Sequence, residues 1–510
     1  MRKPIAAAIG LVRGLTARSA AARAAVAAIR RPLGAMLARA GVVVPALPSD
    51  AEDPAAYARW VAEFDAIDDG VALEPPAGWT VLTSGDIVVR SSAVALAAAS
   101  LAADPEVDLI YADEDVLAPD GARRDPWFKP DWTPEPAYGG QDMVGGGFVM
   151  VRRSELEAAG DLAPGLEALD LALRLPPGRI RHIPRVLAHR RAPHTVEGLA
   201  KLAARHAGAP SVASPHGGFR IAWPLPEPRP LVSVIVPTRD RADLLARCAK
   251  GVLRETAYGP LELLIVDNGS VEPTTFALFE TLKADSRVRV IAAPGAFNYS
   301  DLNNRAAAQA RGGIVLLLNN DIAVTRGDWL DELVAQVSRP DVGAVGARLL
   351  FGDGRLQHAG IIAGAGGVAS YYHPYAARTA RGYRDALVTV REVSAVTGAC
   401  LAIRREAFEA VGGLDAEHLA VTFNDVDLCL RLREQGWRIL WTPFAELTHH
   451  ESASRGSDLA PEHRARYVAE AAYMRARWGD QLKADPFYNP NFSLENGAFR
   501  LVRPPRRMPG

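Results

Sequence analysis

The strongest constraint on the fold is an alternation of short apolar runs and helix-like segments after residue 230. Leu231–Val236 and Leu261–Val266 are apolar runs of strand length, and Arg241–Leu253 between them has helical periodicity. This order predicts a parallel α/β sheet with right-handed crossovers. Further elements are expected as two strands, Val288–Ala292 and Ile314–Leu318, and a helix between them over Tyr299–Ala310.

A proline-rich stretch, Trp223–Pro230, divides the chain, because it can continue neither a helix nor a central strand. We therefore predict a stiff linker between two α/β units. The expected organisation is a helical segment over residues 1–70, a first unit over 71–222, a second over 231–460, and a C-terminal helix and tail over 461–510.

The composition excludes several classes of protein. The formal net charge of -1 gives no global field that would attract nucleic acid, and no basic stripe accompanies the motifs described below. The 3 cysteines lie far apart without a CxxC pair, which predicts buried, reduced thiols and a cytoplasmic location. Arginines interrupt every long apolar run, so we expect neither a membrane-spanning helix nor a cleaved signal peptide.

The N-terminal segment is basic, since only lysine and arginine charges precede Asp50. Apolar residues recur between these cations at helical spacing. Such a helix can lie on the anionic inner surface of a membrane, or it can be a solvated helix that packs on its own protein. Both interpretations stay open.

The two halves of the chain resemble one another. Asp86 and Asp321 each precede a proline by the same interval, at Pro105 and Pro340. Two downstream segments also recur: Met150–Arg153 echoes Ala402–Arg405, and Leu171–Leu175 echoes Leu428–Leu432. The first half is therefore expected to be a shortened copy of the second.

Polar clusters follow three of the expected strands, where ligands gather in parallel α/β sheets. Pro237-Thr238-Arg239-Asp240 and Asp267-Asn268-Gly269-Ser270 could hold a nucleoside, with Asp267 accepting hydrogen bonds. Asn319-Asn320-Asp321 offers oxygen ligands for Mg²⁺ or Mn²⁺. Ordinary turns are the alternative interpretation. The first two clusters could be strand-to-loop turns rich in Asp and Gly, and the third could be an Asx-rich turn without a metal.

A later segment, Asn424-Asp425-Val426-Asp427, opens an amphipathic helix. Asp425 is interpreted as a general base and Asp427 as a simple helix cap. His449-His450 follows the expected strand Arg438–Trp441 and a turn at Pro443. Either imidazole could complete a metal shell or contact phosphate, and His449 is preferred.

Taken together, these motifs resemble family 2 glycosyltransferases with the GT-A fold, a Rossmann-like nucleotide-diphospho-sugar transferase domain, over roughly Leu231–Gly456. Thr397-Gly398-Ala399-Cys400 and Phe297-Asn298-Tyr299-Ser300 belong to the same pattern. The resemblance implies the following site. The nucleotide is bound by Pro237, Thr238, Arg239, Asp267, Asn268, Asn304 and Asn320, the divalent ion by Asp321, Asn319 and His449, and the base is Asp425.

The resemblance implies an inverting transfer from a nucleotide sugar, UDP- or dTDP-linked, to a glycan or a lipid-linked glycan. The segment Asp485–Asn491 resembles the tail of bacterial members that build O-antigen and related polysaccharides. In the first half, Ala168 stands where Asp425 is expected, and no counterpart of the nucleotide region is visible. We therefore expect a degenerate, non-catalytic GT-A-like half used for acceptor binding or assembly.

Two alternatives remain. A sugar- or nucleotide-binding scaffold without turnover is favoured if Asn319, which stands where many members have aspartate, abolishes metal binding. A processive polysaccharide synthase is suggested by Met474-Arg475-Ala476-Arg477-Trp478, although the glutamine of the corresponding motif and the membrane spans are missing.

Overall fold

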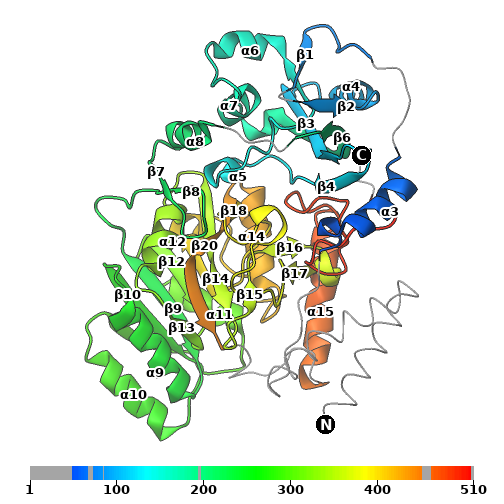
Figure 1. Ribbon diagram of the computed structural model, residues 1–510. Helices are drawn as coiled ribbons and strands as arrows, with labels where there is room; N and C mark the ends of the chain where they lie inside the picture. The colour runs from blue at the N-terminus through cyan, green and yellow to red at the C-terminus, as the bar shows by residue number, and fades with distance from the viewer. Residues whose placement is uncertain (1–48, 67–72, 84–85, 193–196, 451–460, 507–510) are drawn as a thin grey trace.

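The computed structural model describes residues 49–66, 73–83, 86–192, 197–450 and 461–506. It contains two α/β units stacked one above the other, with the N-terminal unit at the top of Figure 1. Of the expected basic segment, residues 1–48 lie outside the described residues. Within the described part, no helix combines the length and the apolar character needed to cross a bilayer.

The N-terminal unit is built on a six-stranded sheet of order β1-β5-β3-β6-β2, with β4 paired to β3. The strands of this unit are β1 (Trp79–Leu82), β2 (Ile87–Val89), β3 (Leu109–Leu117), β4 (Arg123–Trp127), β5 (Val149–Arg152), β6 (Ile180–Arg190), β7 (Ser211–Ala213) and β8 (Phe219–Ile221). Its helices are α3 (Pro54–Phe64), α4 (Ala93–Ala103), α5 (Glu135–Tyr138), α6 (Arg153–Ala159), α7 (Glu167–Arg174) and α8 (Leu199–Ala207).

The C-terminal unit is built on a ten-stranded sheet of order β11-β10-β9-β12-β19-β14-β20-β13, with β15 paired to β14 and β18 paired to β20. Its strands are β9 (Val232–Thr238), β10 (Leu261–Asp267), β11 (Val288–Ala292), β12 (Ile314–Leu318), β13 (Ile322–Val324), β14 (Val342–Leu350), β15 (Leu356–His358), β18 (Arg391–Glu392), β19 (Cys400–Arg404) and β20 (Arg438–His449), beside a hairpin of β16 (Ile361–Ala363) and β17 (Ala369–Tyr371). Its helices are α9 (Ala242–Lys250), α10 (Pro273–Lys283), α11 (Tyr299–Ala307), α12 (Trp329–Val337), α13 (Arg405–Ala410), α14 (Asn424–Glu434) and α15 (Pro461–Trp478).

The expected strands and helices of the second unit are present, with two corrections. The sheet is mixed rather than fully parallel: β11, β10, β9 and β12 are parallel, β19 runs antiparallel to both β12 and β14, and β20 is parallel to β14 but antiparallel to β13. The expected turn at Pro443 is wrong, because β20 continues through it to His449. Pro443 lies where the register of β20 against β14 shifts, and a bulge accommodates the missing N–H of proline.

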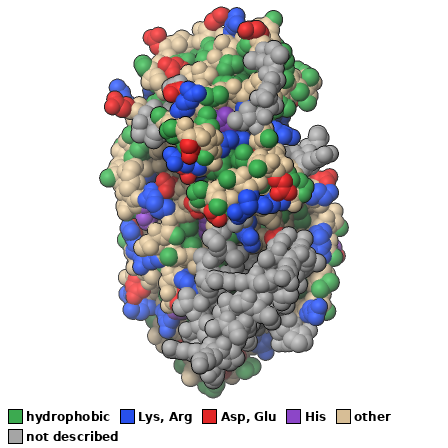
Figure 2. Space-filling model, turned by 45° about the vertical axis from the view of Figure 1, so that its right-hand side comes forward, with side chains coloured by type: hydrophobic (Ala, Val, Ile, Leu, Met, Phe, Trp, Pro, Cys, Tyr) green, Lys and Arg blue, Asp and Glu red, His purple; other side chains and the backbone are tan. Residues whose placement is uncertain are grey.

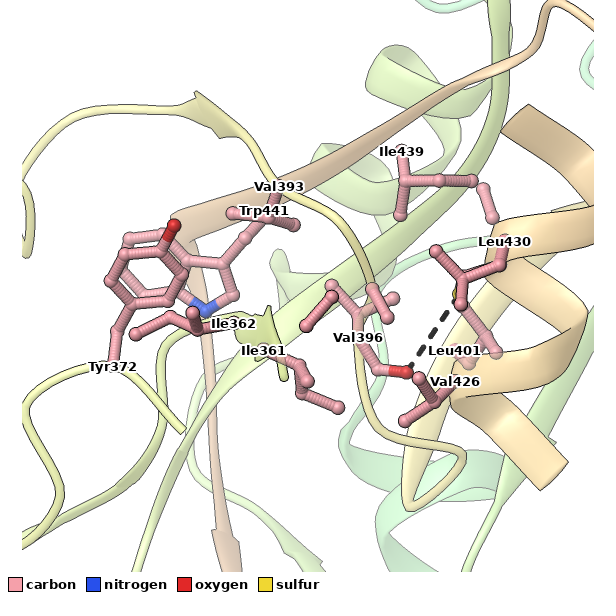
Figure 3. Packing of buried hydrophobic residues seen from close by; sticks show 14 of the residues in the cluster. Ile361, Ile362, Tyr372, Val393, Val396, Leu401, Val426, Leu430, Ile439 and Trp441 are labelled. Carbon is pink, nitrogen blue, oxygen red and sulfur yellow. Dashed lines mark hydrogen bonds between the residues drawn. The ribbon is translucent and has the colours of Figure 1, made fainter. Parts of the chain in front are cut away.

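The core lies on both faces of the large sheet. Figure 3 shows one part of it, in which Val426 and Leu430 of α14 pack against Val396, Leu401 and Ile439. All five side chains are buried, so α14 is fixed on the sheet by its apolar face. The three cysteines are buried and form no disulfide, as the sequence predicts.

The two sheets correspond strand by strand. The order β1-β5-β3-β6-β2, with β4 beside β3, matches β12-β19-β14-β20-β13, with β15 beside β14. Each matched pair also has the same sense; β3–β6 and β14–β20 are parallel, and the other matched pairs are antiparallel. Within the described residues, the N-terminal sheet has no counterparts of β9, β10 and β11.

The N-terminal unit contacts the second unit at the start of β20. Glu135 accepts hydrogen bonds from Arg438 at 2.6 Å and from Arg339 at 2.8 Å. Burial alone would raise the pKa of Glu135, but these two guanidinium groups lower it to about 2. His449 lies at the other end of β20, on the order of 35 Å away for a strand of this length. This contact is therefore remote from the carboxyl end of the sheet.

A C-terminal strap, residues 485–506, runs beside α3 and joins the two units (Figure 1). Asn489 Nδ2 donates to Asp113 Oδ2 at 3.0 Å, and Trp60 Nε1 donates to the Val502 carbonyl at 3.1 Å. Asp485 accepts from the Ala363 N–H of the second unit at 2.6 Å. On the face in Figure 2, basic and acidic side chains alternate, in agreement with the small net charge.

Candidate functional site

The carboxyl ends of β9 and β10 bring together three of the predicted nucleotide-binding residues. Thr238 and Asp267 are register partners at the ends of these strands. Asn320 Nδ2 donates to Thr238 Oγ1 at 3.0 Å, which ties the end of β12 to the same edge. Asp267 Oδ1 accepts from the Ser270 N–H at 2.9 Å, so the carboxylate is fixed by its own turn. Polar groups from three adjacent strands therefore meet at one edge of the sheet.

The other predicted nucleotide residues have different surroundings. Pro237 is buried within β9, and Arg239 is exposed at the strand end. The Asn268 amide donates to the Ala293 carbonyl at 2.9 Å and supports the loop that follows β11. Asn304 donates to the Leu414 carbonyl at 2.8 Å and accepts from the Leu414 N–H at 2.9 Å. These bonds hold the 411–420 loop, so both ends of the Asn304 amide are engaged within the protein.

Asp321 and His449 form a buried pair at the ends of β12 and β20. Asp321 Oδ1 lies 3.0 Å from His449 Nε2, and the Asn319 amide nitrogen lies 3.3 Å from the same Nε2. Burial alone raises the pKa of Asp321, but the neighbouring His449 imidazole outweighs burial and leaves the pKa below its ordinary value. The structure thus brings the three predicted metal ligands together.

The chemistry of this group fits a divalent cation. Asp321 Oδ1 is buried, and in the part of the chain that the structure describes it faces His449 Nε2 at 3.0 Å without a hydrogen bond of ordinary geometry. His449 Nδ1 lies 2.8 Å from Gln357 Oε1 and donates to it, which leaves Nε2 facing the carboxylate. No three His, Cys, Asp or Glu side chains converge on one point among the described residues. An ion here would need oxygen ligands from its substrate, as Mg²⁺ and Mn²⁺ often take.

Asp425 stands in the first turn of α14, held by two backbone N–H groups. Its Oδ2 accepts from Gly398 at 2.9 Å and its Oδ1 from Val426 at 2.9 Å. Burial raises the pKa of Asp425, and the hydrogen bonds from these N–H groups reverse only part of the effect. A carboxylate with a raised pKa in a half-buried position can accept a proton from a hydroxyl.

Asp425 and the Asp321–His449 pair are linked through the Gly398–Ala399 segment. The Asn319 N–H donates to the Ala399 carbonyl at 3.0 Å, one residue from the Gly398 that binds Asp425. Tyr299 of α11 donates its hydroxyl to the Gly398 carbonyl at 2.8 Å. Burial raises the Tyr299 pKa, and the charges of Asp425 and Asp321 raise it further.

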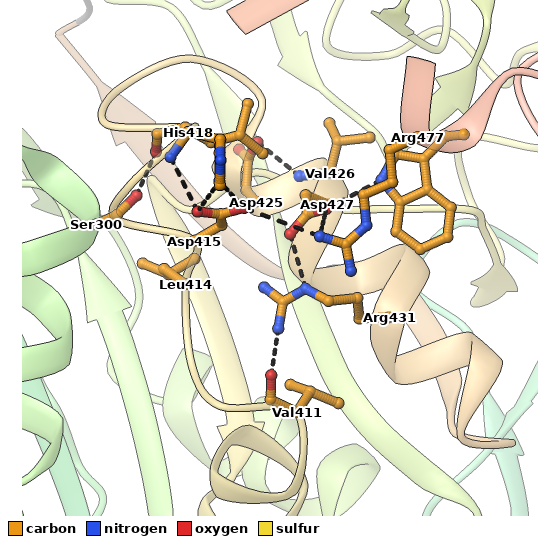
Figure 4. A network of polar contacts seen from close by, with 12 residues as sticks. Ser300, Val411, Leu414, Asp415, His418, Asp425, Val426, Asp427, Arg431 and Arg477 are labelled. Carbon is orange, nitrogen blue, oxygen red and sulfur yellow. Dashed lines mark hydrogen bonds and ion pairs between the residues drawn. The ribbon is translucent and has the colours of Figure 1, made fainter. Parts of the chain in front are cut away.

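Asp427 is not a simple cap, contrary to the sequence-based interpretation. It is fully buried and accepts from Arg431 Nε at 2.7 Å and from Trp478 Nε1 at 3.0 Å. Figure 4 shows Arg431 continuing to the Val411 carbonyl, at 2.6 Å. Asp427 therefore anchors α14 to α15 and to the 411–420 loop, and Trp478 is a buried donor in this anchor.

His450 lies beside the pair rather than within it. Its N–H donates to the Asp321 carbonyl at 3.0 Å, and its ring Nε2 lies 3.2 Å from Arg247. Burial and the Arg247 charge lower the pKa of His450. Of the two histidines, His449 is the one whose ring nitrogen faces Asp321.

Comparison with known proteins decides the family. A family profile described as "Glycosyltransferase like family 2" matches residues 228–480. The N-acetylglucosaminyl-diphospho-decaprenol L-rhamnosyltransferase of Mycobacterium tuberculosis is 30% identical over 249 residues, which cover 44% of this chain and 79% of that protein. The chain belongs to glycosyltransferase family 2.

Two longer relatives align with this glycosyltransferase over both halves. Protein y4gI of Sinorhizobium fredii is 42% identical over 84% of this chain and 50% of its own length. The O-antigen biosynthesis protein RfbC of Myxococcus xanthus is 40% identical over 79% of this chain and 33% of its own length. The chain thus spans half of one relative and a third of the other.

A solved structure also matches. It is the mannosyltransferase PcManGT of Pyrobaculum calidifontis in complex with GDP-Man and Mn²⁺, with a TM-score of 0.38 and 20% identity. The match covers 50% of this chain and 68% of that chain.

Sequence reasoning missed two residues of the candidate site, Gln357 and His358. They are buried polar side chains on the short strand β15, and one of them contacts His449. The signal available was a pair of polar residues directly after the turn Gly352-Asp353-Gly354, in an otherwise apolar stretch.

Proposed function

We propose that this family 2 enzyme is a metal-dependent, inverting glycosyltransferase whose working site lies in residues 231–460. The main support is the position of Asp425. Its carboxylate accepts a hydrogen bond from the Gly398 N–H, and the next residue, Ala399, accepts one from the Asn319 N–H. The link through Ala399 to Asn319, whose amide lies against His449, supports a base at Asp425 that acts together with the Asp321–His449 pair. Asp425 would accept the proton of an acceptor hydroxyl, whose oxygen attacks the anomeric carbon from the face opposite the leaving group.

The donor is a nucleoside diphosphate sugar, with UDP or dTDP favoured. Thr238 and Asp267 would bind the nucleoside at the ends of β9 and β10, supported by Asn320. Mn²⁺ or Mg²⁺, held by Asp321 and His449 with the Asn319 amide, would neutralise the charge that develops on the departing diphosphate. The other residues of this set would shape the nucleotide site. Pro237 would do so through the backbone of β9, Arg239 at the exposed rim, and Asn268 and Asn304 through the loops that they hold.

The acceptor is a glycan or a lipid-linked glycan of a cell-surface polysaccharide, and the sugar transferred is a hexose or rhamnose. Support comes from the names of the relatives, an O-antigen biosynthesis protein and an N-acetylglucosaminyl-diphospho-decaprenol L-rhamnosyltransferase. The enzyme would then work in the cytoplasm, at the inner membrane surface where such acceptors are found, with residues 1–70 as a candidate peripheral contact.

The N-terminal half, residues 71–222, is proposed to be a degenerate and non-catalytic GT-A-like unit. Ala168 stands at the position of Asp425. Arg190 stands at the position of His449, because Arg190 pairs with Ile87 in the first sheet as His449 pairs with Ile322 in the second. Its carboxylate-rich strand β3 is buried in ion pairs, for example Lys129 with Glu114 at 2.8 Å. A scaffold role fits these replacements.

The stereochemistry of the product and donor binding test this function together. With a labelled nucleotide sugar and an acceptor glycan, NMR of the new linkage should give the anomer opposite to that of the donor. Asp425→Asn should lose transfer while it still binds the nucleoside diphosphate with Mn²⁺, as measured by calorimetry. Retention of configuration would contradict the inverting mechanism. Undiminished turnover by Asp425→Asn would remove Asp425 from the role of base.

A further inference from the structure

The short strand β15 (Leu356–His358) carries two buried polar side chains that point into different parts of the candidate site. Gln357 is 3% exposed and His358 is fully buried. β15 pairs with the end of β14, with His358 opposite Leu349. Adjacent residues of a strand project to opposite faces, so one short strand can act on two groups at once.

Gln357 acts on the candidate metal ligand His449. Its Oε1 lies 2.8 Å from His449 Nδ1 and accepts the ring N–H. This bond fixes the tautomer and the rotation of the imidazole, so that Nε2 is directed at Asp321 Oδ1, 3.0 Å away. Loss of the bond would remove the contact that fixes Nδ1 as the protonated nitrogen and would weaken the hold on the orientation of the ring.

His358 acts on the backbone next to Asp425. Its Nδ1 donates to the Ala347 carbonyl at 3.0 Å, and its Nε2 accepts from the N–H groups of Gly360 and Thr397, each at 3.2 Å. Burial lowers the His358 pKa to about 3, so the ring is neutral and can accept at Nε2. His358 thus fixes Thr397 to the sheet.

Gly398, which follows Thr397, holds the candidate base Asp425. The Gly398 N–H donates to Asp425 Oδ2 at 2.9 Å, and the Gly398 carbonyl accepts from Tyr299. A Cβ at position 398 would lie 3.2 Å from the Tyr299 hydroxyl, so this turn has little room to move. Displacement of Thr397 would therefore be passed to the Gly398 N–H and to Asp425.

We propose that β15 positions both halves of the catalytic machinery, Gln357 through the metal ligand His449 and His358 through the Thr397–Gly398 turn that holds Asp425. This inference rests on the proposed function. The matched strand of the N-terminal sheet supports it, because Trp127 stands opposite Glu114 as His358 stands opposite Leu349. Pro126 and Trp127, which replace Gln357 and His358 there, carry no side-chain acceptor.

The first test measures Mn²⁺ binding to the full chain by calorimetry, without a donor. Gln357→Leu should weaken Mn²⁺ binding about 10- to 100-fold, the range typical when a metal-bound histidine loses its partner. Gln357→Glu, which keeps an acceptor near Nδ1, should stay within a few fold of wild type. The same Mn²⁺ affinity in Gln357→Leu and wild type would overturn the role of Gln357.

The second test uses steady-state transfer with the nucleotide sugar that the wild type turns over best. His358→Leu should lower kcat about 100-fold with little change in the Mn²⁺ dissociation constant, since the loss is one of base placement. His358→Gln keeps a donor and an acceptor and should recover most of kcat. Equal kcat in His358→Leu and wild type, or parallel loss in both variants, would overturn the role of His358.

The pH profile separates positioning from a general loss of folding. Among the described residues, the titratable groups that face Asp425 are Tyr299 of α11 and Cys429 of α14, and both stay uncharged because burial raises their pKa values. Loss of the Gly398 hydrogen bond removes a contact that lowers the Asp425 pKa. The acid limb of kcat in His358→Leu should therefore move to higher pH, whereas an unmoved acid limb would contradict the proposal.

The two ways of failing are distinguishable. If the wild type binds no Mn²⁺, the proposed metal site is wrong, and this inference is overturned with it. If the wild type binds Mn²⁺ and transfers sugar, but the β15 variants match their conservative partners in every readout, only the positioning role is overturned.

Discussion

The N-terminal sheet and the matched part of the C-terminal sheet differ in chemistry rather than in architecture. Both use the same strand order and the same pairing senses. Both also anchor their central helix through a buried carboxylate. Asp170 pairs with Arg174 in α7 as Asp427 pairs with Arg431 in α14, each four residues apart. The anchor is retained in a half that lacks the candidate base.

The difference lies at the carboxyl ends of the strands. In the C-terminal sheet this edge carries Asp321, His449 and, nearby, Asp425. In the N-terminal sheet the corresponding end of β3 is covered by the strap and by α3. Tyr57 donates to Asp115 at 2.6 Å there. We therefore propose that packing and catalysis are separable demands on this fold, and that the first half meets only the demands of packing.

The largest expected effect comes from the candidate base. Asp425→Asn removes the proton acceptor while it keeps the shape and the hydrogen-bond acceptor for Gly398, so kcat should fall about 1000-fold. The matched control is Glu167→Gln, in the first turn of the corresponding helix α7, and it should leave kcat unchanged. A comparable loss in the control would place catalytic function in both halves.

The candidate metal ligand gives the next contrast. Asp321→Asn removes the buried carboxylate beside His449 and should lower metal-dependent turnover at least 100-fold, with a weaker apparent Mn²⁺ affinity. Asp86→Asn changes the matched residue of the first half, which is exposed and lies 3.6 Å from Arg191. It should keep wild-type Mn²⁺ dependence, and a shift in that dependence would contradict a non-catalytic first half.

Acid should inhibit the enzyme in a predictable way. Because burial raises the pKa of Asp425, the active carboxylate is lost as the pH falls through that raised value, above the ordinary range of aspartate. Turnover in a pH series should therefore decline on the acid side while the protein remains folded by circular dichroism. An acid limb at the ordinary aspartate pKa would argue against Asp425 as the titrating base.

The smallest difference between the halves is expected for their shared anchors. Asp427→Asn and Asp170→Asn each leave a guanidinium without its buried partner, and each should destabilise its own unit by about 3 kcal/mol. Denaturant unfolding with fluorescence would measure both, with the exposed Asp480→Asn as a control. If only one of the anchors matters, the two units do not share a packing scheme.

The sequence alone predicts the motif positions better than their contacts. Apolar runs predicted β11 and β12 to the residue, because each is a short, largely apolar segment that pairs with a parallel neighbour. The prediction for β20 was wrong at Pro443. The bulge that accommodates proline there depends on how β20 pairs with β14, and the local sequence does not show that pairing. Helix α11 ends at Ala307 rather than Ala310.

In the candidate site, too, the residues were predicted better than their contacts. Asp321, Asn319 and His449 were predicted from strand ends and family resemblance, and they do meet. The functions of Asn304, Asp427 and Gln357 depend on partners more than 40 residues away in the chain: Leu414, Trp478 and His449. Such pairings follow from the packing of whole elements, which local periodicity does not encode.

The most direct test of the central claim is release of nucleoside diphosphate from a panel of UDP-, dTDP- and GDP-sugars, with Mn²⁺, with Mg²⁺ and with EDTA. It compares the wild type with Asp425→Asn and Asp86→Asn. We predict release from one class of donor that requires the metal, is lost in Asp425→Asn and is unchanged in Asp86→Asn. Release that survives both EDTA and Asp425→Asn would contradict a metal-dependent site in the C-terminal half.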